Sequence, residues 1–430
     1  MPAETPKKTL YKVILAASIG NFVEWFDFAV YGFLATVIAK QFFPGDDPQA
    51  SLLKTFVVFA VAFAFRPLGG VVFGMLGDKI GRKRTLAITI LLMAGATTAI
   101  GVLPNYAAIG VAAPLLLTLA RCIQGFSAGG EYAGACAYVM EHAPRQQRGR
   151  YGSFLPVSTF SAFAAAAVVA YVLNTWLSPE VMADWGWRVP FILAAPMGLI
   201  GLYLRTRLAE TPAFQAVALE DDVATHAPLR EAFASHGGRI VWLSLFISVT
   251  ALSFYTFTTY YSTYLQVAGH MDRGSALLVS VGTLLVAMAL CPLAGRYSDY
   301  VGRKRSMLTV CVLAIAAAYP SFLLASTGNV ALGLLGGALQ ALAAVLSGVV
   351  TAALLSELFP TRIRYTASAI SYNMAYTVFG GTAPLVATYL IEQTGNQMAP
   401  AFYLIAVAAV AFLGSTQLPE TGDVDLAHAN

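Results

Sequence analysis

The stretch GMLGDKIGRKR, residues 74–84, returns later in the chain as GRYSDYVGRKR, residues 295–305. The two copies share a glycine, an aspartate and a Gly-Arg-Lys-Arg ending at matching positions. A second pair follows in the same order, because EHAPRQQR, residues 141–148, returns as ELFPTRIR, residues 357–364. Two motifs that recur in one order indicate that the chain consists of two parallel repeats.

The repeats lie in a very apolar chain. Of its 430 residues, 58% are hydrophobic and 11% are charged, and the mean hydropathy is +0.68. A soluble protein of this composition could not cover its surface with polar groups. We therefore expect an all-α integral membrane protein that is not an enzyme. Nucleic-acid binding is excluded as well, because no basic stripe with interleaved aromatic residues is present.

Apolar runs long enough to cross a bilayer, which takes about 20 residues, predict twelve transmembrane helices. The predicted helices lie near 11–40, 51–77, 85–104, 108–141, 150–176, 187–208, 239–268, 274–297, 306–325, 329–357, 364–393 and 398–416. This spacing predicts an N-terminal six-helix half over 1–208, a cytoplasmic linker over 209–238, a C-terminal half over 239–416 and a cytoplasmic tail over 417–430.

The distribution of basic residues predicts the orientation. Most of the 26 Lys and Arg residues fall on one side of the predicted helices, and the positive-inside rule then places both termini in the cytoplasm. The stretch LPETG, residues 418–422, has the form of a sortase signal, but it precedes only a short polar segment, so we interpret it as part of the tail. We expect no cofactor or metal, because the histidines and cysteines lack ligand-like spacing.

Four stretches identify a family. They are GNFVEWFDFAVYGF (20–33), FRPLGGVVFGMLGDKIGRKR (65–84), RCIQGFSAGGEYAGA (121–135) and DWGWRVPF (184–191). Through them, and over nearly its whole length, the chain resembles the major facilitator superfamily. Within that superfamily it resembles the metabolite:proton symporters, which include proline/betaine, α-ketoglutarate, citrate and shikimate transporters. The resemblance implies the major facilitator fold, with two pseudo-symmetric six-helix halves, and alternating access in the bacterial inner membrane.

The resemblance also implies that the repeated motifs form a latch that closes the cytoplasmic side. An aspartate at a helix end can meet the N-terminus of a neighbouring helix, which favours negative charge. The alternative is a charge cluster that only sets orientation, but acidic residues contribute little to orientation. The predicted latch residues are Gly74, Asp78, Arg82, Asp299 and Arg303, with the ion-pair partners Glu141 and Arg148, and Glu357 and Arg364.

Five ionisable residues lie within the apolar runs, all in the first half: Glu24, Asp27, Arg66, Arg121 and Glu131. Each costs about 2.5–3.5 kcal/mol at the bilayer centre, so each needs a partner or a function. Glu24 and Asp27 are three residues apart and share one helix face. Two neighbouring carboxylates cannot both stay ionised cheaply, so we expect proton coupling at Asp27 first, then at Glu24 or Glu131. The alternative is a static ion pair with Arg66 or Arg121.

The predicted substrate site uses both halves. Arg121 and Arg66 can each bind a carboxylate, and Gln124 and Tyr31 lie one helical turn from Arg121 and Asp27 respectively. The resemblance matches Arg121 to a basic position in the fourth helix of the superfamily. The second half contributes aromatic and polar candidates: Tyr255, Thr259, Tyr372, Asn373 and Tyr376. Aromatic rings suit a quaternary ammonium and hydroxyls suit a carboxylate, whereas rings that face lipid are the alternative.

The sequence thus predicts a proton-coupled symporter that imports a small polar metabolite and acts as a monomer. The metabolite is either a zwitterionic osmolyte, such as proline or glycine betaine, or a small organic acid, such as α-ketoglutarate. A uniporter or antiporter of the same fold is one alternative. A membrane sensor that does not transport is another, which the lack of a soluble signalling domain disfavours.

Overall fold

The computed structural model describes residues 7–207, 210 and 228–426, and none of these residues lies in a β-strand. The N-terminal half contains α1 (Lys7–Phe33), α2 (Ala35–Phe42), α3 (Pro48–Ile80), α4 (Arg82–Val102), α5 (Tyr106–Ile109), α6 (Ala112–His142), η1 (Arg145–Gln147), α7 (Arg148–Gly152), α8 (Phe154–Trp176), α9 (Pro179–Asp184), η2 (Gly186–Arg188), α10 (Val189–Ile192) and α11 (Ala194–Thr206). The C-terminal half contains α13 (Pro228–Tyr255), η4 (Thr256–Tyr260), α14 (Tyr261–Val267), α15 (Arg273–Val301), α16 (Arg303–Ala325), α17 (Val330–Glu357), α18 (Arg364–Ala375), η5 (Tyr376–Gly380), α19 (Ala383–Thr394) and α20 (Ala399–Gln417).

These helices confirm the prediction of an all-α membrane fold. Within the described residues, 11 helical segments are long and apolar enough to cross a membrane. The helix α6 is not among them although it has 31 residues, and it carries the buried polar side chains of Arg121, Gln124 and Glu131. The predicted linker, 209–238, lies mostly outside the described residues, and α13 already begins at Pro228. The predicted domain boundaries therefore stay a prediction.

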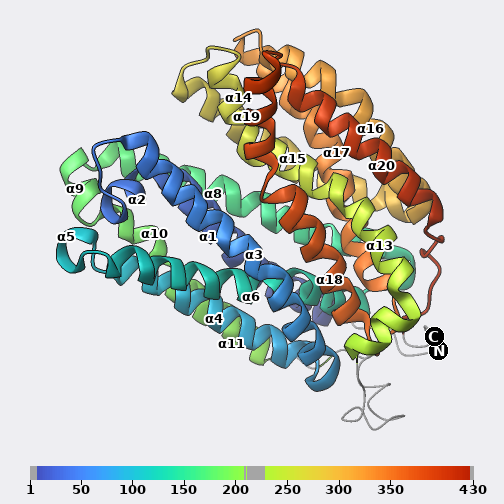
Figure 1. The fold of residues 1–430 in the computed structure, drawn as a ribbon. Helices are drawn as coiled ribbons and strands as arrows, with labels where there is room; N and C mark the ends of the chain where they lie inside the picture. The colour runs from blue at the N-terminus through green and yellow to red at the C-terminus, as the bar shows by residue number, and fades with distance from the viewer. Residues whose placement is uncertain (1–6, 208–209, 211–227, 427–430) are drawn as a thin grey trace.

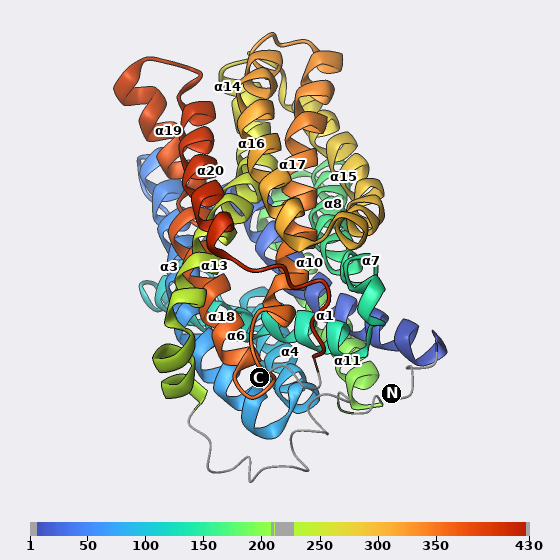
Figure 2. The same cartoon turned by 90° about the vertical axis from the view of Figure 1, so that its right-hand side faces the viewer.

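The two halves lie side by side (Figure 1). The helices α9 and α14 are at the upper ends of the two halves, whereas α3, α6 and α18 come together lower down. Figure 2 shows the same bundle from the side, with the last described residues running across its lower part. We call the end that holds the repeated motifs, residues 74–84 and 295–305, the motif end. Here α3 packs against α18, and α15 packs against α7.

Glycines bring α3 and α6 into backbone contact, which fixes the helices that carry the buried arginines. A Cβ atom on Gly125 would lie 1.8 Å from the carbonyl oxygen of Ala62, and one on Gly129 would lie 2.2 Å from that of Arg66. A Cβ atom on Gly69 would lie 1.7 Å from the carbonyl oxygen of Phe126. Small residues at such positions let membrane helices approach closely. The spacing of α3 and α6 therefore depends on these glycines.

The loop motifs end in two tight turns with matching caps. Gly81 and Gly302 have φ values of 100° and 91°, a conformation that favours glycine, and each precedes a helix, α4 or α16. Glu210 accepts from the backbone N–H of Lys83 at 3.1 Å, and Glu420 accepts from that of Lys304 at the same distance. Each glutamate follows the last helix of its half. The repeat therefore extends to a third element, which was not predicted from the sequence.

Candidate functional site

The first buried ion pair joins α1 to α3. Arg66 Nη2 lies 2.6 Å from Glu24 Oε1, and both side chains are buried. The guanidinium carbon of Arg66 lies 5.5 Å from the ring centroid of Trp25, within the range of a cation–π contact. Arg66 Nε and Nη1 and Glu24 Oε2 have no hydrogen-bond partner within the described chain. Buried polar groups normally have partners, so these atoms leave Arg66 and Glu24 able to bind a further polar group.

A second network surrounds Asp27, about one helical turn away. Gln124 Nε2 donates to Asp27 Oδ2 at 2.5 Å and to Thr97 Oγ1 at 2.9 Å. Arg121 Nη1 donates to Gln124 Oε1 at 2.8 Å and lies 3.5 Å from Asp27 Oδ2. The ring of Tyr31 lies 4.3 Å from the guanidinium carbon of Arg121. The structure thus brings the predicted residues Asp27, Arg121, Gln124 and Tyr31 together, with Gln124 between the two charges.

A third carboxylate, Glu131, pairs with Arg205, which was not among the residues predicted from the sequence. Arg205 of α11 forms a close ion pair with Glu131, and Thr89 Oγ1 donates to Glu131 Oε2 at 2.6 Å. A Cβ atom on Gly20 would collide with both Arg205 and Glu131, so this glycine lets α1 cross the pair. No sequence spacing links Arg205 to Glu131, which is why the pairing was not predicted.

The three acid–arginine pairs follow one helix. Their contacts with α1 fall at Gly20, Glu24 and Asp27, a span of roughly 10 Å at 1.5 Å per residue. Each carboxylate has its own arginine, which is what burial of charge requires. Within the described residues, no group of three or more His, Cys, Asp or Glu side chains is placed to hold a metal ion.

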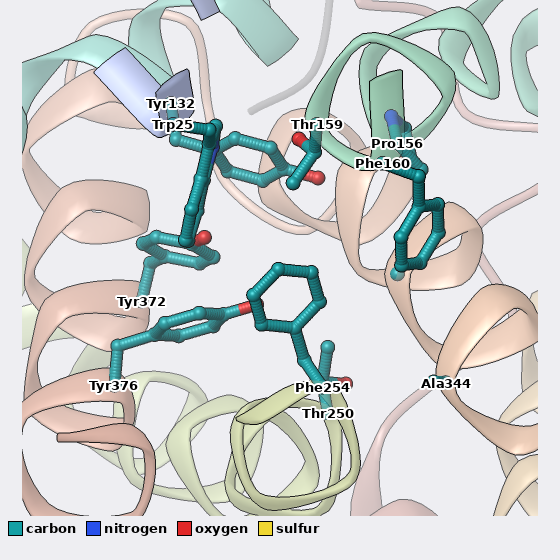
Figure 3. A pocket seen from close by; sticks show the side chains of 11 residues that line it. Trp25, Tyr132, Pro156, Thr159, Phe160, Thr250, Phe254, Ala344, Tyr372 and Tyr376 are labelled. Carbon is teal, nitrogen blue, oxygen red and sulfur yellow. The ribbon is translucent and has the colours of Figure 1, made fainter. Parts of the chain in front are cut away.

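A small aromatic cavity lies between the two halves (Figure 3). Its walls come from α1, α6, α8, α13, α17, α18 and η5, and the lining residues are Trp25, Tyr132, Pro156, Thr159, Phe160, Thr250, Phe254, Ala344, Gly348, Tyr372 and Tyr376. Figure 3 shows Trp25, Tyr132, Tyr372 and Tyr376 on one side, and Phe160 and Ala344 on the other. Trp25 joins this cavity to the Arg66 pair, because it lines the first and contacts the second.

The candidates from the second half divide between different places. Tyr372 and Tyr376 line the cavity, with their ring centroids 4.1 Å apart. Tyr255 packs behind the cavity wall, with its ring 6.3 Å from Trp25 and 5.6 Å from Phe63. Thr259 is exposed on η4. Of the aromatic lining residues, four were not predicted, because an aromatic residue in an apolar helix looks the same whether it faces a cavity or lipid: Trp25, Tyr132, Phe160 and Phe254.

Asn373 joins the two halves instead of lining the cavity. Its Nδ2 donates to the carbonyl oxygen of Gly129 on α6 at 2.6 Å and to that of Ala369 at 2.7 Å. Nearby, Tyr365 Oη donates to the carbonyl oxygen of Gly130 at 2.5 Å. The Gly-Gly pair of α6 is therefore a contact for α18 of the other half.

At the motif end, both aspartates lie at helix N-termini of the opposite half. Asp78 accepts from the backbone N–H groups of Tyr365 and Thr366, at 3.1 and 2.8 Å, in the first turn of α18. Asp299 accepts from those of Gly149 and Arg150, at 2.7 and 2.8 Å, in α7. The carboxylate therefore meets the positive end of a helix, and the contact crosses from one half to the other.

The ion pairs of the motif end differ from those expected. Glu141 pairs with Arg364, at 2.8 Å, and not with the nearby Arg148. Glu357 pairs with Arg303, at 3.0 Å, and lies 3.9 Å from Arg148. The reason is that the two halves face each other, so Glu141 and Glu357 each lie near an arginine of the opposite half. The Glu-Pro-Arg motif thus links the halves and does not close on itself.

The C-terminal segment, residues 418–426, lies across the motif end. Thr421 Oγ1 donates to Glu357 Oε2 at 2.9 Å, and the carbonyl oxygen of Val424 accepts from Arg148 Nη1 at 2.7 Å. Burial alone would raise the pKa of Glu420, but backbone N–H donors, which include that of Arg303 at 2.7 Å, hold this pKa below its ordinary value. The LPETG stretch is therefore part of the closed motif end.

Known proteins are similar to this chain in sequence and in fold. The profile of the Major Facilitator Superfamily matches residues 17–335 and 276–421. The chain is 39% identical over 424 residues to the proline/betaine transporter of Escherichia coli K12, covering 96% of this chain and 84% of that protein. It is 38% identical over 429 residues to an ectoine/proline transporter of Corynebacterium glutamicum, covering 96% and 85%.

Among solved structures, a proton:xylose symporter bound to 6-bromo-6-deoxy-D-glucose superposes with a TM-score of 0.77 at 19% identity, covering 98% of both chains. At that identity the likeness shows the fold alone. Together with the matching profile and the relatives in the transporter family, it confirms the predicted fold class and the expectation of a transporter that is not an enzyme. The chain belongs to the Major Facilitator Superfamily and is a multi-pass membrane transporter.

Proposed function

We propose that this transporter imports a small zwitterionic osmolyte, such as proline or glycine betaine, together with protons. The observation that carries the proposal is the position of Trp25 between an arginine with unpartnered N–H groups and an aromatic cavity. A zwitterion needs these two surfaces side by side. The relatives named as proline/betaine transporters support the same substrate class.

Each end of the substrate has a matching surface. Each of the free atoms Nε and Nη1 of Arg66 can donate a hydrogen bond to a substrate carboxylate. The rings of Trp25, Tyr132, Tyr372 and Tyr376 can surround the ammonium group, which aromatic faces attract. A small organic acid would use Arg66 but would leave the aromatic cavity without a cation. This difference favours the zwitterion over α-ketoglutarate.

We propose that proton coupling acts through the charge of Arg66, which the substrate carboxylate and Glu24 share. A substrate carboxylate on Arg66 weakens the bond from Arg66 to Glu24, and a carboxylate that loses its cation in a buried site binds a proton more readily. Asp27, which Gln124 links to Arg121, is the next carboxylate along α1 and the first choice from the sequence. Glu131, already satisfied by Arg205 and Thr89, is the third.

The proposed membrane placement is a bacterial inner membrane, with both termini and the motif end in the cytoplasm and a monomer as the working unit. The positive-inside rule supports this orientation, because the Gly-Arg-Lys-Arg sequences lie at the motif end. The contacts of Asp78, Asp299 and the crossed ion pairs hold that end closed. Alternating access requires these contacts to break when the substrate leaves.

Uptake by purified protein in liposomes tests the proposal. Radiolabelled glycine betaine, proline and α-ketoglutarate are supplied with and without an inward proton gradient. We expect uptake of glycine betaine and proline above their equilibrium levels only with the gradient, and little uptake of α-ketoglutarate. Accumulation that ignores the gradient would favour the uniporter or antiporter. Preferred uptake of α-ketoglutarate would overturn the substrate class.

Variants at the acids separate the proton sites. We expect Glu24→Gln and Asp27→Asn each to abolish gradient-driven accumulation while the protein still exchanges external for internal substrate, because exchange needs no net proton movement. Asp272→Asn is a matched control, since Asp272 is an exposed helix cap on α15, away from the buried network. An Asp27→Asn variant that still accumulates substrate would exclude Asp27 as a proton site.

A further inference from the structure

A buried asparagine next to the aromatic cavity makes more hydrogen bonds than its place in an apolar helix requires. Asn21 Nδ2 lies 2.7 Å from Ser158 Oγ, 2.8 Å from Thr159 Oγ1 and 3.1 Å from the carbonyl oxygen of Leu155, all on α8. Its Oδ1 accepts from the indole Nε1 of Trp25 at 3.1 Å. Asn21 therefore links Trp25, one turn away on α1, to a fixed point on α8.

Trp25 is one of the side chains of the N-terminal half that meet aromatic residues of the other half. Its ring centroid lies 5.0 Å from that of Phe254 and 6.3 Å from that of Tyr376, both in edge-on contacts. The guanidinium carbon of Arg66 lies 5.5 Å from the same ring centroid. A rotation of the indole would change the cavity wall and the surroundings of Arg66 together. The orientation of this ring therefore sets the shape of the site.

We propose that Asn21 is a positioning residue for the transport site, which acts by holding the Trp25 indole through the Oδ1···H–Nε1 bond. The amide is suited to this role because its NH2 group and its oxygen bind different partners. The NH2 group is used by α8, so the amide cannot turn, and the oxygen then points to the indole. Thr159 both binds Asn21 and lines the cavity, so the anchor and the site share one helix.

The inference rests on the proposed function, since it assigns a substrate affinity to the orientation of Trp25. The first test is a double-mutant cycle with glycine betaine uptake in liposomes. We expect Asn21→Leu, close to Asn in size, to raise KM about tenfold while Vmax stays within about twofold. Trp25→Phe removes the N–H donor, so Asn21→Leu should have no further effect on KM in that background. Independent effects of the two changes, multiplying in the double variant, would overturn the proposal.

Two further variants guard against trivial causes. Ser158→Ala removes one α8 acceptor of Asn21 and leaves the bond to Trp25 in place, so we expect KM within about twofold of the wild type. A tenfold rise in this variant would place the effect in helix packing and overturn the proposal. Asn21→Ser is too short to reach the indole and should reproduce the rise in KM if Asn21→Leu does not fold.

A measurement without substrate separates this inference from the proposed function. The indole N–H signal of Trp25 in an NMR spectrum, identified by its loss in Trp25→Phe, should move upfield in Asn21→Ser because the hydrogen bond is lost. An unchanged signal would overturn the inference whatever the protein transports. A wild-type protein that takes up neither glycine betaine nor proline would overturn the proposed function and leave this second readout valid.

Discussion

Asp78→Asn should shift the motif end from closed to open. The carboxylate of Asp78 accepts two backbone N–H groups at the start of α18, at 3.1 and 2.8 Å, and lies 3.4 Å from Arg82. An asparagine has one acceptor oxygen, so one charge-assisted bond is lost, and the remaining bond is neutral. Bonds to charged groups contribute about 1.5–3 kcal/mol each. A loss of about 2 kcal/mol changes the closed-to-open ratio by about 30-fold.

Spin labels at Lys79 and Arg305 provide the assay, because both residues are exposed at the motif end on opposite halves. Distance distributions from pulsed electron resonance give the fraction of open molecules. Asp299→Asn should cause a similar shift, since Asp299 binds two N–H groups of α7. Asp272→Asn is the matched control, because Asp272 caps α15 within one half. Unchanged distances in Asp78→Asn, or an equal change in the Asp272 control, would refute the reasoning.

Three other predictions concern stability and the C-terminal segment. Arg205→Met should lower the free energy of unfolding by about 3–5 kcal/mol, because Glu131 is left buried without its cation. Adding Glu131→Gln should recover part of this loss. Denaturant unfolding in micelles measures both effects, and Arg207→Met is the control because Arg207 is exposed. Gly129→Ala should lower the melting temperature, because the added Cβ would lie 2.2 Å from the backbone of Arg66. Gly95→Ala should leave the melting temperature unchanged, because nothing lies within 4 Å of its Cβ. Equal melting temperatures for the two variants would contradict this. The contact of Glu420 with α16 should be complete above about pH 4.5 and should weaken as the pH falls through the lowered pKa of Glu420. Limited proteolysis should therefore release the C-terminal segment of the wild type only in acid. The segment of the Glu420→Gln variant should be cut already at neutral pH.

The sequence predicted the fold and the contacts of the motif aspartates better than the cavity. An acidic residue that recurs at a fixed place in a repeat is not needed to orient the helices, and Asp78 and Asp299 do bind helix N-termini as expected. Their role in a latch stays a prediction. The pairing of Glu141 with Arg364 was not predictable, since it depends on how the halves face each other. The hydropathy pattern likewise did not predict the ion pair of Arg205 with Glu131, because a basic residue at the end of a membrane helix commonly serves only to orient the helix.

The cavity lining was hardest to predict because its chemistry is not polar. Trp25, Phe160 and Phe254 are ordinary residues for a membrane helix, and only the fold places them around one space. Asn373 shows the opposite case: this polar residue in an apolar run suggested a ligand contact, but its Nδ2 donates to two backbone carbonyl groups, of which that of Gly129 lies across the interface. A polar residue in an apolar run thus predicts a hydrogen-bond partner, but the sequence does not say whether that partner is a substrate or another part of the protein.

The alignment of the two halves shows where the symmetry ends. When the two halves are aligned so that Glu141 matches Glu357, Gln124 matches Gln340 and Arg121 matches Gly337. At Gly337 a Cβ atom would lie 2.4 Å from Thr283, so the second half has no room for the arginine. A second small cavity lies beside Gln340 and Ser253. The C-terminal half thus keeps the glutamine and a hollow beside it, without the charges.

The difference between the two halves gives the proposed function its physical basis. Asp78 and Asp299 each bind a helix N-terminus of the opposite half, so the proposed opening and closing can use matched contacts. The pairs of Glu24 with Arg66 and of Asp27 with Arg121 lie in the N-terminal half, and Trp25 connects the first pair to a cavity that rings of both halves line. In the proposed function, a zwitterion uses Arg66 for its carboxylate and the rings for its ammonium group, whereas a simple anion uses Arg66 alone.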